Sequence, residues 1–169
     1  MSDFTFTPTE AERQEIEVPF IEDARADFAP YYRSRKGIGE AKLDLSQALI
    51  KLGAIVMGIQ EGKFGTGSTA RYGYQVYYVY HNARGVFRVA GLPIKGNHTK
   101  AKIEQVKVQA LLNAADWWKS VLTQRVFSPG TDPLLMNLLV DGHRTVADYI
   151  REVGNLPKLL SDVVEGEYE

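Results

Sequence analysis

One uninterrupted segment, Thr99 to Phe127, contains neither glycine nor proline. Apolar residues recur in it every three or four positions, at Ile103, Val106, Ala110, Ala114, Trp117 and Val121. This spacing places them on one face of an α-helix. At about 1.5 Å per residue, such a helix runs on the order of 40 Å and can cover one face of a small sheet. The sequence therefore predicts a long amphipathic helix, with Trp117 in its buried stripe and Trp118 at an interface.

Three segments upstream of this helix have the composition of β-strands. The first begins with the alternating residues Ile55 to Gln60, and the glycine-rich Gly65 to Ser68 follows it. The second and third are Arg71 to His81 and Arg84 to Ile94, which are joined by a short turn. Alternating apolar residues separated by turn residues predict an antiparallel β-meander over about residues 54 to 94.

Two shorter helices are expected on either side of these elements. Before the meander, Leu45, Ala48, Leu49 and Leu52 have the spacing of one helix face, and Gly53 ends the segment. Near the C-terminus, Thr145 and Asp148 form a capping-box pattern at the start of a helix that reaches Val153.

The fold class expected from these elements is α+β. A three-stranded antiparallel β-meander (about 54–94) packs against a long helix (about 99–127), with a preceding helix and small C-terminal helices. A chain of 169 residues fits one domain, expected over residues 1–164. The last residues, Glu165 to Glu169, hold three carboxylates and little to pack, which predicts a flexible acidic tail.

The charge of the chain is segregated although its total is only −1. Residues 63 to 107 hold eight lysines and arginines against one glutamate, a local balance of +7. Residues 1 to 30 and 141 to 169 are acidic, with balances of −6 and −4. Electrostatic attraction acts over roughly 8 to 10 Å at physiological salt, so the local balance matters more to a polyanionic partner than the total.

Tyrosines alternate with these basic residues. Positive charge attracts phosphates, and aromatic rings stack on unpaired bases, so the mixture predicts binding of single-stranded DNA or RNA. The predicted binding residues are Lys63, Arg71, Tyr77, Arg84, Arg88, Lys95, Lys100 and Lys102. Four rings, Tyr72, Tyr74, Tyr78 and Tyr80, share one side of a strand and form either a stacking platform or the core beneath the long helix. In the second case Arg71, Tyr77, Arg84 and Arg88 are the exposed set.

Other chemistry has little support in the sequence. The chain has no cysteine, which excludes disulfides and thiol nucleophiles and fits a cytoplasmic location. Its three histidines are widely spaced and do not form a zinc motif. No run of residues is apolar enough to span a membrane, and the acidic N-terminus does not read as a secretory signal. We therefore expect no catalytic residue, no metal, no cofactor and no membrane partner.

Two alternatives to a nucleic-acid-binding protein remain open. The chain could be a protein interaction or structural subunit without a nucleic-acid role. It could also be a metal-dependent nuclease, because Glu61 and Lys63 with Asp44 upstream offer two carboxylates for Mg²⁺ and a lysine for developing negative charge.

The order of elements over about residues 43 to 127 is helix, three-stranded meander, long helix. It resembles phage single-strand annealing proteins, where a meander packed on helices lines a basic groove. It also resembles the double-stranded-RNA-binding fold, where lysines begin the last helix as Lys100 and Lys102 do here. The resemblance implies a nucleic-acid partner and assigns no residue a role. The leading hypothesis is a non-catalytic single-stranded nucleic-acid-binding protein in DNA recombination, replication or repair, monomeric or homo-oligomeric.

Overall fold

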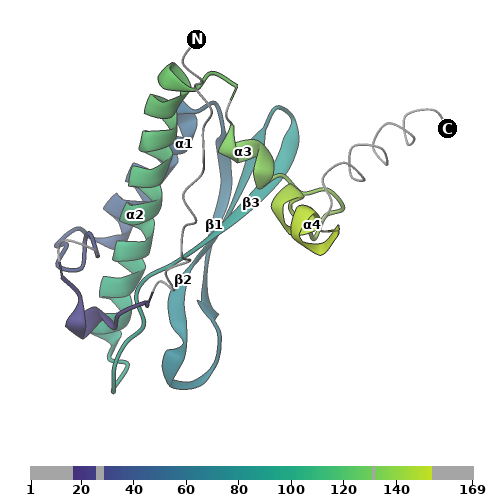
Figure 1. The fold of residues 1–169 in the computed structure, drawn as a ribbon. Coiled ribbons are helices and arrows are strands. Elements are labelled where there is room, and N and C mark those ends of the chain that lie inside the picture. The colour runs from purple at the N-terminus through teal and green to yellow at the C-terminus, as the bar shows by residue number, and fades with distance from the viewer. Residues whose placement is uncertain (1–16, 26–28, 131, 154–169) are drawn as a thin grey trace, which may run out of the picture.

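The computed structural model describes residues 17–25, 29–130 and 132–153 (Figure 1). A three-stranded antiparallel sheet in the order β1–β2–β3 packs against helices, which confirms the predicted α+β class. The strands are β1 (Ile55–Phe64), β2 (Arg71–Tyr80) and β3 (Ala83–Ala90), and the helices are α1 (Ile38–Lys51), α2 (Lys100–Phe127), α3 (Pro133–Met136) and α4 (Val146–Val153). Two short 3₁₀ turns are also present: Ile21–Asp23 precedes α1, and Gly67–Thr69 lies between β1 and β2. The predicted acidic tail, Glu165 to Glu169, lies outside the described residues.

Helix α2 has the length that the sequence predicts. It begins where the side chain of Thr99 accepts a hydrogen bond from the backbone N–H of Lys102, which caps the helix. It ends at Phe127, before Ser128, Pro129 and Gly130. No helix in the described part of the chain is long and apolar enough to cross a membrane.

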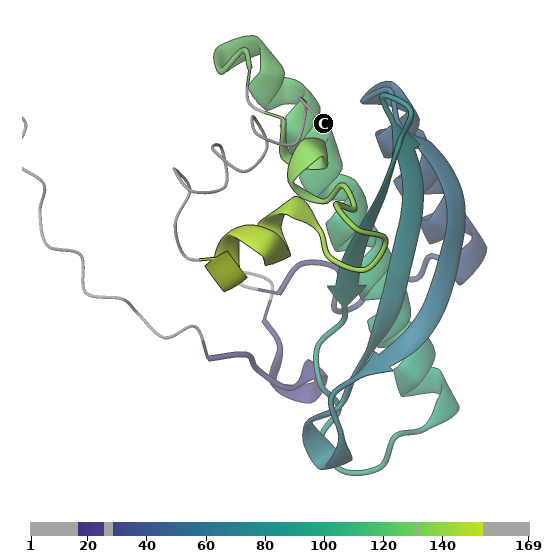
Figure 2. The same ribbon diagram turned by 90° about the vertical axis from the view of Figure 1, so that its right-hand side faces the viewer.

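The sheet has two different faces. Residues Tyr74, Val76, Tyr78 and Tyr80 of β2 are buried and point toward α1 and α2, which lie together on this side of the sheet (Figures 1 and 2). The register pairs Val76 with Phe87 and Tyr74 with Val89, so these residues of β3 face the helices as well. The tyrosines therefore form core rather than a stacking platform, and the alternate residues point away from the two helices.

Two glycines allow close packing on the helix side. A Cβ added to Gly85 would lie 2.3 Å from the ring of Tyr78, which covers this glycine from the neighbouring strand. The Tyr78 hydroxyl then reaches the carbonyl of Leu134 at 2.6 Å. At Gly91 an added Cβ would lie 2.0 Å from the carbonyl oxygen of Val106, so the chain after β3 passes directly against α2. Any larger residue at either position would push these elements apart.

The expected burial of Trp117 is wrong. Trp117 is 49% exposed, whereas Trp118 is fully buried with its ring centroid 5.2 Å from that of Phe87. Trp118 lies seven positions after Leu111, four after Ala114 and three after Ala115, which is the spacing of one helix face. All three of these residues are buried. Because both tryptophans fit a helical period relative to earlier apolar residues, the period alone does not distinguish them.

The C-terminal segment returns to the sheet on the side opposite α2. After α3, the N–H of Val86 donates to the carbonyl of Asn137 and the N–H of Leu139 donates to that of Arg84, so this stretch lies along the free edge of β3. Residues 139 to 145 then form a tight hairpin that leads into α4 (Figure 2). The predicted capping box is present, since Thr145 and Asp148 exchange hydrogen bonds between side chain and backbone at 3.1 Å in both directions.

Candidate nucleic-acid interface

The outer face of the sheet, which points away from α1 and α2, is basic. Its strand residues are Ile55, Gly58, Gln60, Gly62 and Phe64 from β1, Arg71, Gly73, Gln75, Tyr77 and Val79 from β2, and Arg84, Val86, Arg88 and Ala90 from β3. They include three arginines and no carboxylate. The one acidic strand residue, Glu61, points to the helix side, where the Lys107 ammonium binds it at 2.9 Å. The C-terminal segment covers part of this face near Val86, which is buried.

A row of polar side chains crosses the outer face. The register places Gln60, Gln75 and Arg88 beside one another on the three strands. Arg88 Nε donates to Gln75 Oε1 at 3.1 Å, Gln75 Nε2 donates to the Tyr77 hydroxyl at 2.5 Å, and that hydroxyl donates to Gln60 Oε1 at 3.3 Å. The row fixes the orientation of the Tyr77 ring and of the Arg88 side chain.

Arg84 and Arg88 are the exposed cations of this face. The side chain of Arg84 makes no hydrogen bond or ion pair with any residue that the structure describes. Arg88 lies near Asp148 at the start of α4, whose carboxyl has a lowered pKa mainly because the Thr145 hydroxyl donates to it, with a smaller contribution from Arg88. Arg84 therefore has its full charge available, and that of Arg88 is partly balanced.

Arg71 has a different position. Its guanidinium is half-buried and donates to the carbonyls of Gly91 at 2.8 Å and Ala90 at 3.3 Å. Burial lowers its pKa. Because these bonds tie the end of β3 to β2, we assign Arg71 to structure, although the sequence placed it among the binding residues.

A pocket of about 320 Å³ opens on the outer face between the strands and the C-terminal hairpin. Its walls include Met57, Tyr77, Val79, Arg84, Leu139 and Gly142. The strand partner of Tyr77 on β1 is Gly58, and a Cβ added there would meet nothing within 4 Å. The bulge between Val56 and Gly58 leaves Met57 68% exposed. The residue directly opposite Tyr77 on β1 is thus a glycine, and the β1 side chain that contacts Tyr77 is Gln60, at its hydroxyl end.

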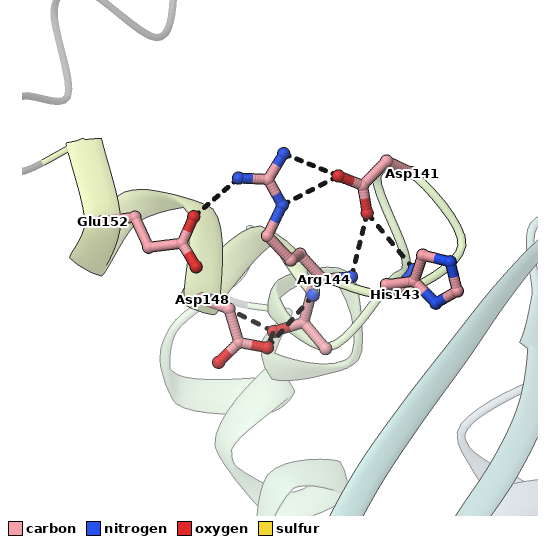
Figure 3. A network of polar contacts seen from close by, with 6 residues as sticks. Asp141, His143, Arg144, Asp148 and Glu152 are labelled. Atoms are coloured by element: carbon pink, nitrogen blue, oxygen red, sulfur yellow. Dashed lines mark hydrogen bonds and ion pairs between the residues drawn. The ribbon is translucent and has the colours of Figure 1, made fainter.

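The hairpin wall of this pocket is held by ion pairs (Figure 3). The Asp141 carboxylate accepts hydrogen bonds from the backbone N–H groups of His143 and Arg144, and it pairs with the Arg144 guanidinium at 2.6 Å. The same guanidinium binds Glu152 of α4 at 2.6 Å. The backbone and side chain of Arg144 lower the pKa of Asp141 to about 2. These contacts position the loop that carries Gly142.

Four of the predicted binding residues lie elsewhere. Lys95 and Lys102 are paired with the N-terminal segment, since the Glu22 carboxylate accepts from the Lys102 ammonium at 2.9 Å and from the Lys95 backbone N–H at 3.0 Å. Burial would raise the pKa of Glu22, but these hydrogen bonds lower it. Lys63 lies over the ring of Tyr72 on the helix side, and Lys100 is exposed at the start of α2. The structure therefore does not bring the eight residues onto one surface.

The carboxylates of the nuclease hypothesis are engaged by lysines. Asp44 binds the Lys36 ammonium at 2.5 Å, and Glu61 binds Lys107. Among the residues that the structure describes, no group of three or more histidines and carboxylates could hold a metal ion.

The sequence did not predict several residues of the outer face. Gln60 and Gln75 have no motif, although strand alternation places Gln75 on the side of Tyr77. Leu139 and Gly142 are far from the strands in the sequence, and no local pattern indicates that they reach the pocket. Comparison of the chain with protein-family models, with curated proteins and with solved structures gave no match.

Proposed function

We propose that this protein binds single-stranded nucleic acid across the outer face of its sheet and does so without catalysis, in DNA recombination, replication or repair. The observation that carries the proposal is the placement of Arg84 and Arg88 beside the Tyr77 ring on a face whose strands contribute no carboxylate. Arginines attract phosphates, and a ring presented on a sheet offers a stacking surface for a base.

A salt titration tests this proposal. Fluorescence anisotropy of a labelled single-stranded oligonucleotide should give an affinity that falls with salt, with a log-log slope of about −0.7 for each phosphate neutralised. Combined Arg84→Ala and Arg88→Ala substitutions should weaken binding and flatten the slope by about 1 to 1.5, because two phosphate contacts are lost. Duplex DNA and RNA of the same length, tested in parallel, establish the preferred strand.

The matched control removes the same charge from the opposite side of the molecule. Lys51 and Lys119 are exposed on α1 and α2. Their combined replacement by alanine should leave the slope unchanged, because neither side chain lies on the outer face. Equal effects of the two double variants would indicate nonspecific attraction, and no binding of wild-type protein at low salt would refute the proposal.

A second candidate is a protein interaction subunit, and exposed apolar residues at the end of α2 favour it. Val126 and Phe127 are each 77% exposed, and Leu135 and Met136 of α3 are also exposed. The ion pair between Arg125 and Asp132 brings the end of α2 close to the start of α3, and exposed apolar side chains on neighbouring elements are typical of contact sites between proteins. Analytical ultracentrifugation of wild-type protein and of Val126→Asp tests this candidate: self-association that the substitution abolishes, together with no oligonucleotide binding, would favour it over the first.

A further inference from the structure

The pocket beside Tyr77 has the features of a site for one flat, apolar ring. Its volume of about 320 Å³ is at the lower end of the roughly 300 to 1,000 Å³ found for small-molecule sites. Met57, Val79 and Leu139 supply apolar walls, and the Tyr77 ring supplies an aromatic one. Such a lining favours a planar heterocycle over a charged or strongly hydrated group.

The Tyr77 ring is oriented before anything binds. Its hydroxyl is held by Gln75 and Gln60. Gly58 leaves the space next to it on β1 open. A ring whose polar end is fixed loses little conformational freedom when a partner stacks on it, which lowers the cost of binding.

Arg84 determines the class of molecule that carries the flat ring. Arg84 lines the same pocket, and it has no ionic partner within the described part of the chain. A base in a strand is joined through its sugar to phosphates, so an arginine at the edge of a base pocket can bind the phosphate of the same nucleotide. An aromatic side chain of a peptide would leave this charge without a partner.

We propose that this pocket holds one unpaired nucleobase of a bound strand, with the base against Tyr77 and a neighbouring phosphate on Arg84. The proposal rests on the proposed function and goes further, because it assigns to one pocket the part of the affinity that depends on bases rather than on phosphates.

The test separates bases from phosphates on the ligand and adds a side chain beside Tyr77 on the protein. The probes are a labelled oligonucleotide of about ten nucleotides and a fully abasic strand of the same length and charge. Wild-type protein should bind the first about tenfold or more tightly than the second, because stacking contributes roughly 1 to 3 kcal/mol for each base. The protein variant is Gly58→Leu, which places a side chain in the open space beside Tyr77.

Gly58→Leu should bind the base-containing strand no more tightly than the abasic strand, while its affinity for the abasic strand stays near that of wild type. Gly62→Leu is the matched control, because Gly62 is on the same strand and face and has no neighbour within 4 Å of an added Cβ, but lies opposite Gly73 rather than opposite Tyr77. It should keep the preference for bases. Thermal melting of both variants verifies that they fold, and Tyr77→Leu is a second way to remove the stacking surface.

Each other outcome has a defined meaning. If wild-type protein binds both strands equally, the proposed function survives and the base pocket is refuted. If it binds neither strand, the proposed function fails as well. If Gly58→Leu and Tyr77→Leu both keep the preference for bases, the base lies elsewhere. If a free nucleoside monophosphate shifts the amide NMR signals of Val79 and Gly142 but the oligonucleotide does not, the pocket serves a free nucleotide and the proposal for a strand is refuted.

Discussion

Trp118 has no exposed surface and packs against Phe87 of the sheet, whereas its neighbour Trp117 is half exposed. Trp118→Ala should therefore lower the free energy of unfolding by about 3 to 5 kcal/mol, the cost of deleting a large buried ring. Trp117→Ala should change it by about 0.5 kcal/mol or less. Urea denaturation of the two variants measures both values, and a larger loss for Trp117→Ala would contradict the packing of α2.

Gly85 allows a second comparison between single residues. Gly85→Ala places a methyl group 2.3 Å from the ring of Tyr78, so the variant should lose about 1 to 3 kcal/mol of stability through overpacking. Gly62→Ala, on an open part of β1, should be neutral or more stable by up to about 1 kcal/mol, because alanine is favoured over glycine within a strand. Thermal melting distinguishes the two, and equal melting temperatures would show that the Tyr78 ring moves away without cost.

At the scale of elements, the C-terminal hairpin and α4 depend on carboxylates whose pKa values are lowered. Asp141 titrates at about 2 instead of its ordinary 3.8, and the pKa of Asp148 is also lowered. A carboxyl group whose pKa is lower in the folded state than in the unfolded state stabilises the fold at pH values above its unfolded pKa. This stabilisation is lost as the pH falls through the folded pKa. Between about pH 4 and pH 2, α4 should therefore loosen before the core does.

Amide NMR signals report this loosening. The N–H groups of His143 and Arg144 bond to Asp141, and the N–H of Thr145 bonds to Asp148, so all three should shift during an acid titration. Asp141→Asn should remove the titration at His143 and Arg144 and preserve it at Thr145. A midpoint near pH 4 for wild-type protein would mean that Asp141 is not held as the structure shows.

At the scale of the whole molecule, one buried side chain connects three distant segments. Gln109 of α2 is 1% exposed, and its Nε2 donates to the carbonyl of Pro30 at 3.2 Å, while its Oε1 accepts from the N–H of Leu92 at 3.1 Å. Gln109→Leu leaves both backbone groups without this partner and should cost about 1 to 3 kcal/mol for each group. Gln124→Leu, at an exposed position of the same helix, should cost about 0.5 kcal/mol or less.

Chemical denaturation of both glutamine variants measures these costs. Limited proteolysis shows which segment is destabilised, because a protease should cut the segment around Pro30 earlier in Gln109→Leu than in wild type. Unchanged stability of Gln109→Leu would show that other contacts, such as the bond between the Tyr31 hydroxyl and Asp116, are sufficient to hold this segment.

Local patterns predicted the elements well because each depends on neighbouring residues. The bounds of α2, the strands and the capping box of α4 follow from periodicity and from turn or cap residues that lie within a few positions. The apolar run from Leu134 to Val140 has no period that distinguishes helix from strand, and in the structure its first part lies in α3 while its next part pairs with β3. The part that pairs with β3 does so because that strand has an open edge. The residues of the run give no indication of this edge.

The candidate site was only partly predictable. Strand alternation gives two sets of residues, and placing Arg84 and Arg88 with Tyr77 requires knowing which set faces the helices. That orientation depends on how the whole sheet packs against α1 and α2, which strand alternation does not show. The pairing of Lys95 and Lys102 with the Glu22 segment, and the approach of Leu139 to the pocket, join residues far apart in sequence. Charge balance over a segment cannot reveal such contacts.

The thioether of Met57 is exposed in the wall of the pocket beside Tyr77, so oxidation of a protein sample would alter this pocket. Peroxides convert methionine to a polar sulfoxide, and an apolar wall would then become a hydrated one. Thiol reagents would offer little protection, because reversal of a methionine sulfoxide is the work of dedicated reductase enzymes. Aged or oxidised preparations should therefore lose recognition of bases while they still attract phosphates.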